Sequence, residues 1–411
     1  LSEPCWKFKW WGVDYWFCDR FQDVFPKNER HLPHDQDAWL ALVAPRILCV
    51  RSAQADAWAG PEGERAATES ASKTWWSMNK PENVDYSIRE GKHDLGFSDW
   101  MHYLDIADER WRGVTVTVKG DDSAAIQKAL DTKERPLTVI IPEGNYDITE
   151  TLKVGSRTHI KAHPGARMIL NGSKPHRFGD FLLSNADERG GNRDIRIEGG
   201  IWDGNKEVGH NLKEPPARKF AEDAWSGCTL NFRNVKGLKL ADLTLANSVT
   251  FNARFCELDG FDIRRIRLVS PLIKNNQDGL HFAGYCFNGV VDGVAVDTKG
   301  QTNDDLIALN ADDSVTRHEN RGTVCGPITN MVIRHVSAED CHCFTRLLRS
   351  AHSIRDITIE ACEVGCRYHA INGDDARKWV AHGGAAGGVE EKDLPASDGV
   401  LANIVIRKLT V

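Results

Sequence analysis

The stretches Leu238-Lys-Leu-Ala-Asp-Leu243 and Phe261-Asp-Ile-Arg-Arg-Ile266 share one pattern: two apolar residues stand one position apart, and a third follows three later. The same pattern returns at Met331-Val-Ile-Arg-His-Val336, Ile357-Thr-Ile-Glu-Ala-Cys362 and Ile404-Val-Ile-Arg-Lys-Leu409, with a looser copy at Val291 and Val294. Steps between the second apolar positions are 23 (240 to 263), 28 (263 to 291) and 26 (333 to 359). Short strands at this interval are typical of a parallel β-helix, whose coils stack their apolar residues. A sandwich would need hairpin turns, and few are evident. We therefore predict a mainly β chain with a right-handed parallel β-helix.

Residues that flank the repeats complete this prediction. The longer steps of 42 (291 to 333) and 47 (359 to 406) leave room for inserted loops or an extra turn. Ahead of the repeats, Asp121-Asp122-Ser123 can cap a short helix with Ile126, Ala129 and Leu130 on one face, placed to close the open end of the solenoid. At the other end, the chain stops inside a repeat at Val411, which we interpret as a truncated C-terminus.

The distribution of tryptophan divides the chain into two domains. Ten of the 13 tryptophans fall in the first 112 residues. Near this boundary, residues 100–111 have helical spacing, and residues 113–118 then alternate as a strand does. We predict one domain over residues 1–112 and the β-helix over residues 113–411, joined by a very short linker.

Composition excludes several classes of protein. Of the 411 residues, 41% are hydrophobic and 27% charged, which is a globular composition. The net charge of -7 gives no basic field for nucleic acid, and no apolar run approaches the roughly 18 residues of a membrane span. The opening stretch has no secretion signal. The 11 cysteines, among them Cys341 and Cys343 or Cys362 and Cys366, show no four-ligand spacing, so we predict structural thiols and neither metal nor cofactor.

Three aspartates occupy matching places in successive repeats. Asp278 lies 15 residues past Ile263, and Asp304 and Asp305 lie 13 and 14 past Val291. If each coil rises by about 4.8 Å, these carboxylates become neighbours on one wall. Neighbouring carboxylates cannot all ionise cheaply, so together they supply an acid and a base, which glycoside hydrolysis requires. Asp304 and Asp305 can share a cleft only if the chain bends before Leu306, because consecutive residues of a straight strand face opposite sides. An alternative also stays open, in which all three aspartates are turn residues that bind backbone amides.

Residues 238 to 310 resemble the polygalacturonase family, family 28 of the glycoside hydrolases, whose fold is the pectate-lyase-like β-helix. Asn276-Gln277-Asp278-Gly279 is similar to the family's Asn-Thr-Asp-Gly, and Asn303-Asp304-Asp305-Leu306 to its Gly-Asp-Asp-Cys. The resemblance implies that Asp304 is the general acid and that Asp278 and Asp305 position the water of an inverting reaction.

The later motifs of that family are matched less closely. Cys341-His342-Cys343 stands for Gly-His-Gly, which would give His342 the task of tuning the acid. Arg367-Tyr368-His369 stands for Arg-Ile-Lys, whose cations hold a sugar carboxylate, but a neutral His is a poor carboxylate anchor. Arg346 and Arg349 could compensate with forked donors, and the alternative is that both lie in a surface loop. With Asn276, the residues Arg367, His369 and Arg346 form the expected substrate-binding set. We expect His281 and His335 to be packed or solvated histidines.

The first domain carries a second resemblance. Asp56 follows the apolar strand Ile47-Leu-Cys-Val50, and His93 precedes a helical stretch, which is the acid-then-histidine order of α/β-hydrolases. The run from Leu32 to Arg46 and the element Gly91-Lys-His-Asp94 resemble the back half of the glucuronoyl esterases, family 15 of the carbohydrate esterases. No serine elbow occurs, so Asp56 and His93 cannot form an acyl-enzyme here. We therefore expect a partial α/β-hydrolase domain without esterase activity; the alternative is that His93 only packs.

Together these patterns predict a fused carbohydrate-active protein. The β-helix would hydrolyse glycosidic bonds in a plant-type polysaccharide, with uronate-containing chains among the candidates. Two alternatives stay open: a polysaccharide lyase, which needs calcium and a basic residue beside the acids, and a catalytically silent β-helix that binds glycans. From the substrate class we expect a secreted or periplasmic protein, with a polysaccharide as its partner.

Overall fold

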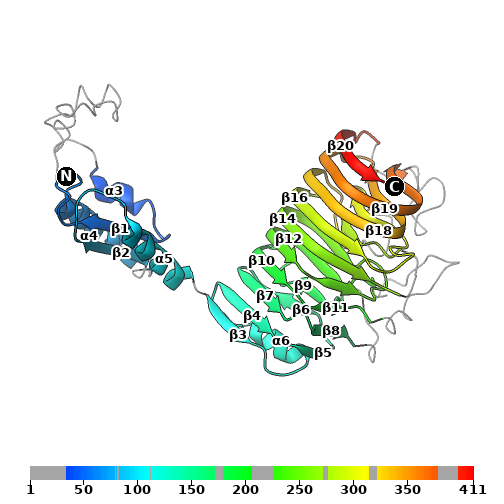
Figure 1. Cartoon of the computed structure of the whole chain (residues 1–411), viewed down its shortest axis with the longest axis horizontal. Helices are drawn as coiled ribbons and strands as arrows, with labels where there is room; N and C mark the ends of the chain where they lie inside the picture. The colour runs from blue at the N-terminus through cyan, green and yellow to red at the C-terminus, as the bar shows by residue number, and fades with distance from the viewer. Residues whose placement is uncertain are drawn as a thin grey trace. The chain divides into compact units, whose positions relative to one another are not determined.

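The computed structural model divides the chain into two compact units, Leu1–Arg112 and Gly113–Val411, which are described separately (Figure 1). It describes residues 34–78, 80, 83–111, 113–171, 177, 179–205, 226–271, 276–313, 322–377 and 397–411. The opening stretch in which we looked for a secretion signal therefore lies outside the described residues, as does the start of the esterase-like run at Leu32. No helix in the described parts is long and apolar enough to cross a membrane.

The first unit is built on two parallel strands with helices around them. Its elements are α3 Gln36–Ala41, β1 Leu48–Ala53, α4 Pro61–Ser77, β2 Val84–Arg89 and α5 Phe97–Trp111. The two strands pair in register from Leu48 opposite Val84 to Ala53 opposite Arg89. A parallel pair needs a crossover connection, and α4 supplies it.

The two faces of this strand pair contact different helices, because successive side chains of a strand point to opposite sides. On one face, the Tyr86 hydroxyl donates to the carbonyl of Pro61 in α4. On the other, Arg51 and Arg89 both donate to Asp99 in α5, at 2.8 and 2.7 Å. The face toward α5 is therefore polar.

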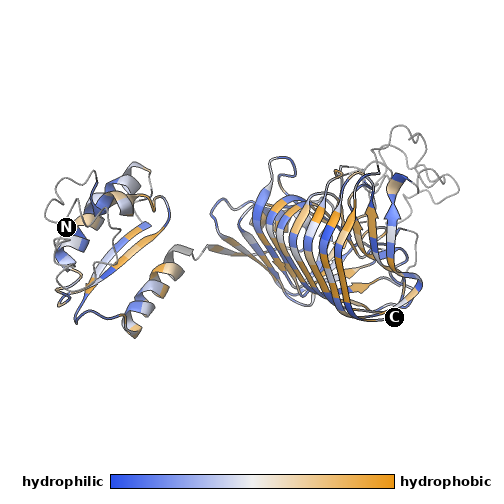
Figure 2. Cartoon of the chain, turned by 90° about the horizontal axis from the view of Figure 1, so that it is seen from above, coloured by the Kyte–Doolittle hydropathy of each residue, from blue (hydrophilic) through white to orange (hydrophobic). Residues whose placement is uncertain are grey.

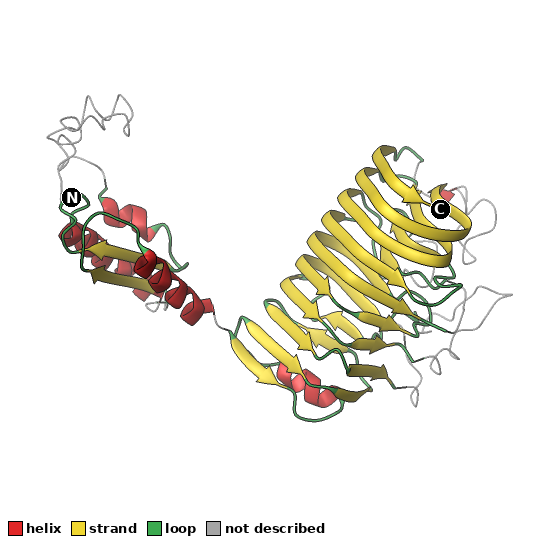
Figure 3. Ribbon diagram, in the orientation of Figure 1, coloured by secondary structure: helices red, strands yellow, loops and turns green. Residues whose placement is uncertain are grey.

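The second unit is a single continuous sheet of parallel strands. Its first coils contain β3 Val114–Thr117, α6 Ser123–Leu130, β4 Leu137–Ile141, β5 Gly144–Ile148, β6 Leu152–Val154, β7 Thr158–Ala162, β8 Ala166–Leu170, β9 Leu183–Asn185, β10 Asn192–Glu198 and β11 Ile201–Asp203. The later coils contain β12 Leu230–Ala241, β13 Thr244–Ala246, β14 Ala253–Val269, β15 Leu280–Phe282, β16 Cys286–Val296, β17 Asp305–Asn310, β18 Ile328–Arg349, β19 Ile354–Asp375 and β20 Leu401–Thr410. Figure 3 shows the strands of successive coils lying one above another, so the prediction of a parallel β-helix is confirmed.

The apolar positions that define the repeat stack directly on one another. Residue by residue, the strand pairings join Leu240, Ile263, Val291, Ile333, Ile359 and Ile406 into one ladder. In Figure 2 the hydrophobic positions of neighbouring coils accordingly line up in bands across the strands. The long steps in the sequence add no coil to this ladder, because Val291 pairs with Ile333 and Ile359 with Ile406. The extra residues are therefore insertions between stacked strands.

The predicted short helix closes the first coils. The side chain of Asp122 accepts from the backbone N–H of Ala125 and so caps the N-terminus of α6. Ile126, Ala129 and Leu130 are buried and belong to the main core. The face expected to pack against the solenoid does so.

Candidate functional site

The structure brings the three repeat aspartates together. Asp278 lies just before β15, Asp304 just before β17, and Asp305 is the first residue of β17. The two strands pair in parallel, with Leu280 opposite Ile307. One carboxylate oxygen from each aspartate lies within 4.8 Å of one from each of the others. Asp304 and Asp305 follow Asp278 by 26 and 27 positions in the sequence, and the stacking of the coils brings their side chains close to it.

Backbone hydrogen bonds join the coils that carry the three aspartates to one another. The N–H of Gly279 donates to the carbonyl of Asp305 at 3.0 Å, and the N–H of Asn252 donates to the carbonyl of Asp278 at 2.9 Å. A buried amide ladder runs beside them, in which Gln301 Nε2 donates to Gln277 Oε1 and Gln277 Nε2 to the carbonyl of Ser248. These bonds hold the residues next to the carboxylates against the neighbouring coils.

The chain bends at the start of β17, as a shared position of Asp304 and Asp305 requires. Leu306 and Ile307 are consecutive, yet both belong to the apolar core, so strict alternation is broken at the start of β17. The side chains of Asp278 and Asp305 are 1% and 4% exposed and therefore buried, whereas the Asp304 side chain is 18% exposed. Asp304 is consequently the carboxylate of the three that solvent reaches most.

His281 is a member of this site that the sequence interpretation missed. Its Nδ1–H donates to Asp278 Oδ2 at 2.6 Å, and both side chains are buried. The imidazole stacks on Phe251 with ring centroids 4.1 Å apart and an interplanar angle of 7°. A histidine three residues after an aspartate at the beginning of a strand was the available signal, but spacing alone does not distinguish this contact from a packed histidine.

His342 lies beside Asp304. Its backbone N–H donates to the carbonyl of Thr302 at 2.9 Å, which ties β18 to the segment before β17. Nδ1 of the ring is 3.9 Å from Asp304 Oδ1, and the ring of Tyr368 is 4.4 Å away. Burial lowers the pKa of His342, and although Asp304 opposes this, Arg367 adds to it. The imidazole is therefore neutral at pH 7.

Arg346 connects two carboxylates from neighbouring coils. It lies on β18, with Nη1 3.8 Å from Asp305 Oδ2 and Nη2 donating to Asp374 Oδ2 at 2.7 Å. Only 6% of its side chain is exposed. The alternative of a surface loop is therefore wrong for Arg346, and its guanidinium faces the aspartates rather than solvent. Arg349, also on β18, donates to Asp375.

Three other residues, Arg367, His369 and Asn276, were predicted to bind the substrate, and they differ in their contacts and in how exposed they are. Arg367 donates to Asn303 Oδ1 at 2.8 Å and to the carbonyl of Gly300 at 3.2 Å, so it contacts the segment that carries Asp304. His369 is exposed and pairs in register with Cys343. Asn276 is half-buried in a left-handed backbone conformation two residues before Asp278.

In the first unit, Asp56 and His93 are in direct contact. His93 Nδ1–H donates to Asp56 Oδ2 at 2.8 Å, and the rings of Trp58 and His93 lie 4.9 Å apart. The other oxygen of Asp56 accepts from the backbone N–H groups of Trp58 and Ala59. The carboxylate is thus fixed, while the His93 side chain remains 61% exposed. The acid–histidine half of a triad has the geometry that nucleophile activation uses.

Two groups within the described residues have donor atoms close enough to hold a metal ion. One consists of Asp278, Asp304 and Asp305, and offers oxygen atoms alone. The other consists of Cys49, Asp85 and His102 in the first unit, and no motif in the sequence indicated it.

Comparisons with known proteins give limited matches. No protein-family model matches the chain. A stretch of 114 residues is 36% identical to "Carbohydrate esterase MZ0003" from an unknown prokaryotic organism, covering 24% of this chain and 26% of that protein. The chain therefore spans about a quarter of the curated relative that it matches.

Three solved structures each match nearly three quarters of this chain. The family 28 exopolygalacturonase of Yersinia enterocolitica has a TM-score of 0.46 at 15% identity, over 72% of this chain and 66% of that one. The alginate lyase of Paenibacillus sp. str. FPU-7 has a TM-score of 0.38 at 10% identity, over 72% and 99%. PfbA, a surface adhesin of Streptococcus pneumoniae, has a TM-score of 0.24 at 12% identity, over 73% and 91%. At these identities no argument about the reaction rests on them.

Proposed function

We propose that residues 113–411 form a glycoside hydrolase that cleaves a plant-type polysaccharide, with uronate-containing chains as the preferred class. The observation that carries this proposal is the approach of three carboxylate oxygens, from Asp278, Asp304 and Asp305, to within 4.8 Å of one another. Glycosidic bond cleavage needs one carboxylic acid and one carboxylate together. The resemblance of the surrounding motifs to family 28 assigns which residue takes which part.

In the proposed reaction, Asp304 protonates the leaving glycosidic oxygen, because it is the most accessible of the three. Asp278 and Asp305 hold a water molecule and accept a proton from it as its oxygen attacks the anomeric carbon. The bond from that carbon to the leaving oxygen breaks, and the new hydroxyl lies on the opposite face of the ring. The proton taken from the water then leaves the Asp278–Asp305 pair to solvent, and Asp304 takes up a proton from solvent, which completes the cycle.

Neutral His342 and buried Arg346 support these roles from either side. The neutral imidazole of His342, with Nδ1 3.9 Å from Asp304 Oδ1, lies beside the acid without placing a positive charge next to it. The Arg346 guanidinium is 3.8 Å from Asp305 and stabilises the negative charge of that carboxylate. Arg346 therefore acts on Asp305 in this proposal and not on the substrate.

For the substrate carboxylate, Arg367 and His369 remain the proposed contacts, with Asn276 beside them. Arg367 already donates to Asn303, next to Asp304, so a sugar acid bound there would lie close to the proton donor. His369 binds a carboxylate well only when it is protonated.

We propose that residues 1–112 are the C-terminal part of a carbohydrate esterase domain of the α/β-hydrolase class. The curated relative matches 24% of the chain, about the share that this unit occupies, and Asp56 and His93 are in contact as such an enzyme requires. An acyl-enzyme would require a nucleophilic serine beside this pair. From the polysaccharide substrate we further propose a secreted or periplasmic location.

The test is a screen of the purified full chain against pectin, rhamnogalacturonan and xylan fragments, with new reducing ends counted. Hydrolysis should release reducing ends without the ultraviolet absorbance of an unsaturated uronate, and it should survive chelation. Absorbance that disappears on chelation would instead indicate a lyase.

The matched variants are Asp304→Asn and Asp259→Asn. Loss of the general acid should lower the rate by about 10²- to 10⁴-fold. Asp259 lies on β14 and bonds to Asn288 on an exposed surface, so its variant should retain the wild-type rate. Glycan binding that is equal in both variants, with no cleavage by the wild type, would show a silent binding protein.

A further inference from the structure

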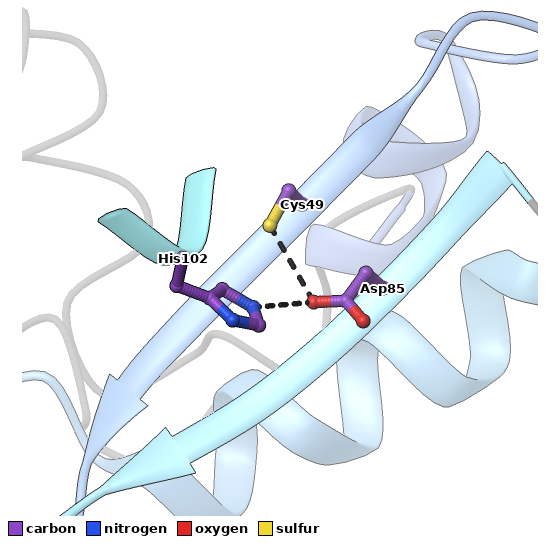
Figure 4. Close-up of side chains that lie close together, drawn as sticks. All are labelled: Cys49, Asp85 and His102. Atoms are coloured by element: carbon purple, nitrogen blue, oxygen red, sulfur yellow. Dashed lines mark hydrogen bonds and ion pairs between the residues drawn. The ribbon is translucent and has the colours of Figure 1, made fainter. Parts of the chain in front are cut away.

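Three side chains of the first unit converge between the strand pair and α5. Cys49 on β1 and Asp85 on β2 are directly opposite one another in the parallel pairing, and His102 reaches them from α5. Figure 4 shows the thiol and the imidazole directed at the same carboxylate oxygen. Cys49 Sγ is 3.5 Å from Asp85 Oδ2, and His102 Nε2 is 2.9 Å from it.

These separations are close to those within a metal site. Zinc binds sulfur at about 2.3 Å and nitrogen or oxygen at about 2.0 to 2.2 Å, so tetrahedral geometry places the donor atoms about 3.3 to 3.6 Å apart. The sulfur–oxygen distance already has this value, and all three donor atoms lie within 4.8 Å of one another. The nitrogen–oxygen distance of 2.9 Å would have to lengthen by about 0.5 Å to reach the same range.

We propose that Cys49, Asp85 and His102 bind a zinc ion that ties β1, β2 and α5 together. One sulfur, one nitrogen and one oxygen donor suit zinc, whereas calcium and magnesium select oxygen alone. When Cys49 binds as the thiolate, its charge and that of Asp85 balance the two charges of the ion. The thiol proton leaves to solvent, and the imidazole binds through Nε2 with its remaining proton on Nδ1.

The surroundings provide support for the ligands and access for a fourth one. The Ser87 hydroxyl lies 2.9 Å from His102 Nε2 and accepts from Arg51 Nη1 at 3.2 Å, and Nε2 exchanges this contact for the metal when it binds. Arg51 also donates to Asp99, which offsets its charge near the site. The side chains of His102 and Asp85 are 22% and 26% exposed, so water can enter as the fourth ligand.

The Cys49 thiol is half-buried in the structure. Metal binding would convert it to a coordinated thiolate, which has a spectroscopic signature of its own.

The experiment titrates the reduced full chain with Co²⁺ as the spectroscopic probe and then displaces it with Zn²⁺. We expect one equivalent to produce a thiolate-to-cobalt charge-transfer band together with the visible bands of tetrahedral Co²⁺. Cys49→Ser should abolish the charge-transfer band, and Asp85→Asn and His102→Gln should weaken binding by at least about tenfold. Cys366→Ser, a half-buried cysteine of the second unit, is the matched control and should change nothing.

A second measurement avoids the question of whether a variant folds. In the wild-type protein, saturating Zn²⁺ should slow alkylation of Cys49 in mild denaturant by at least about tenfold, measured by peptide mass spectrometry. Equal alkylation of Cys49 with and without zinc, or a charge-transfer band that persists in Cys49→Ser, would overturn the proposal.

Discussion

His281 Nδ1 and Asp278 Oδ2 lie 2.6 Å apart, both on fully buried side chains, at the place where one coil passes beneath the next. The histidine binds the carboxylate from within the same coil, and Asp304 and Asp305 belong to the following coil. The hydrogen bond that orients Asp278 is therefore made within its own coil and does not involve the neighbouring one.

Replacing His281 with Ala should therefore affect stability as well as activity. A buried acceptor that loses its hydrogen bond costs about 1 to 3 kcal/mol, and the cavity beside Phe251 adds to this. Urea unfolding measures the change. His335→Ala is the control, because that side chain is 59% exposed and bonds to Asp292 at the surface, so less than about 1 kcal/mol is expected. Equal losses in both variants would contradict a special role for His281.

The titration of His342 should lie below the ordinary histidine value of 6.5, because burial disfavours its protonated form. A histidine with a lowered pKa in the folded state takes up its proton first in the unfolded chain. Its contribution therefore destabilises the fold as the pH falls through 6.5 and is negligible above that pH. Histidine side-chain NMR follows the midpoint, and His342→Gln identifies the signal. A midpoint above 6.5 would refute the assignment.

Gly279→Ala should separate the coils at the site. A Cβ at this position would lie 2.4 Å from the carbonyl oxygen of Leu306, so the strand after Asp278 must move away from β17. Overpacking of this kind costs about 1 to 3 kcal/mol, and a displacement of 1 Å near reacting groups can cost about 10²-fold in rate. Gly155→Ala is the comparison, since its Cβ would meet only a flexible arginine end at 3.5 Å. Full activity in Gly279→Ala would argue that the coil spacing is unimportant.

Arg346→Met removes the cation that lies between Asp305 and Asp374. Because the Arg346 and Asp305 side chains are 6% and 4% exposed, its loss leaves the buried Asp305 carboxylate without this cation, at a cost of about 3 to 5 kcal/mol, while Asp374 at 26% exposure contributes less. Arg346→Lys should restore most of the stability but not the forked geometry, so kcat should remain reduced while KM changes little. A large rise in KM with unchanged kcat would instead favour direct contact with substrate.

Much of the fold was predictable because the repeat is a local pattern with a physical meaning. Leu240, Ile263 and Val291 recur at the interval of a coil, and the structure stacks them one on another. The helix capped by Asp122 was equally readable, since a cap and an apolar face are both local. By contrast, the length of each insertion gave no indication that Val291 pairs directly with Ile333.

At the candidate site, sequence spacing brought the three aspartates to one wall, but it did not reveal what surrounds them. His281 is packed as one of the expected alternatives, but its hydrogen bond to Asp278 was not anticipated, and the contact of Arg346 with Asp305 was not either. Both depend on which side of a strand a residue occupies at an irregular bend, and the period of two does not survive such a bend.

The sequence by itself determined the repeat, the boundary near residue 112 and the common offset of Asp278, Asp304 and Asp305, because each follows from composition or periodicity along the chain. Only the tertiary structure decided the contacts across coils and between strand and helix. The pairs Asp278–His281 and Asp305–Arg346, and the meeting of Cys49 and Asp85 with His102, depend on side-chain direction and distance. Periodicity fixes the order of the coils, but packing alone sets those directions.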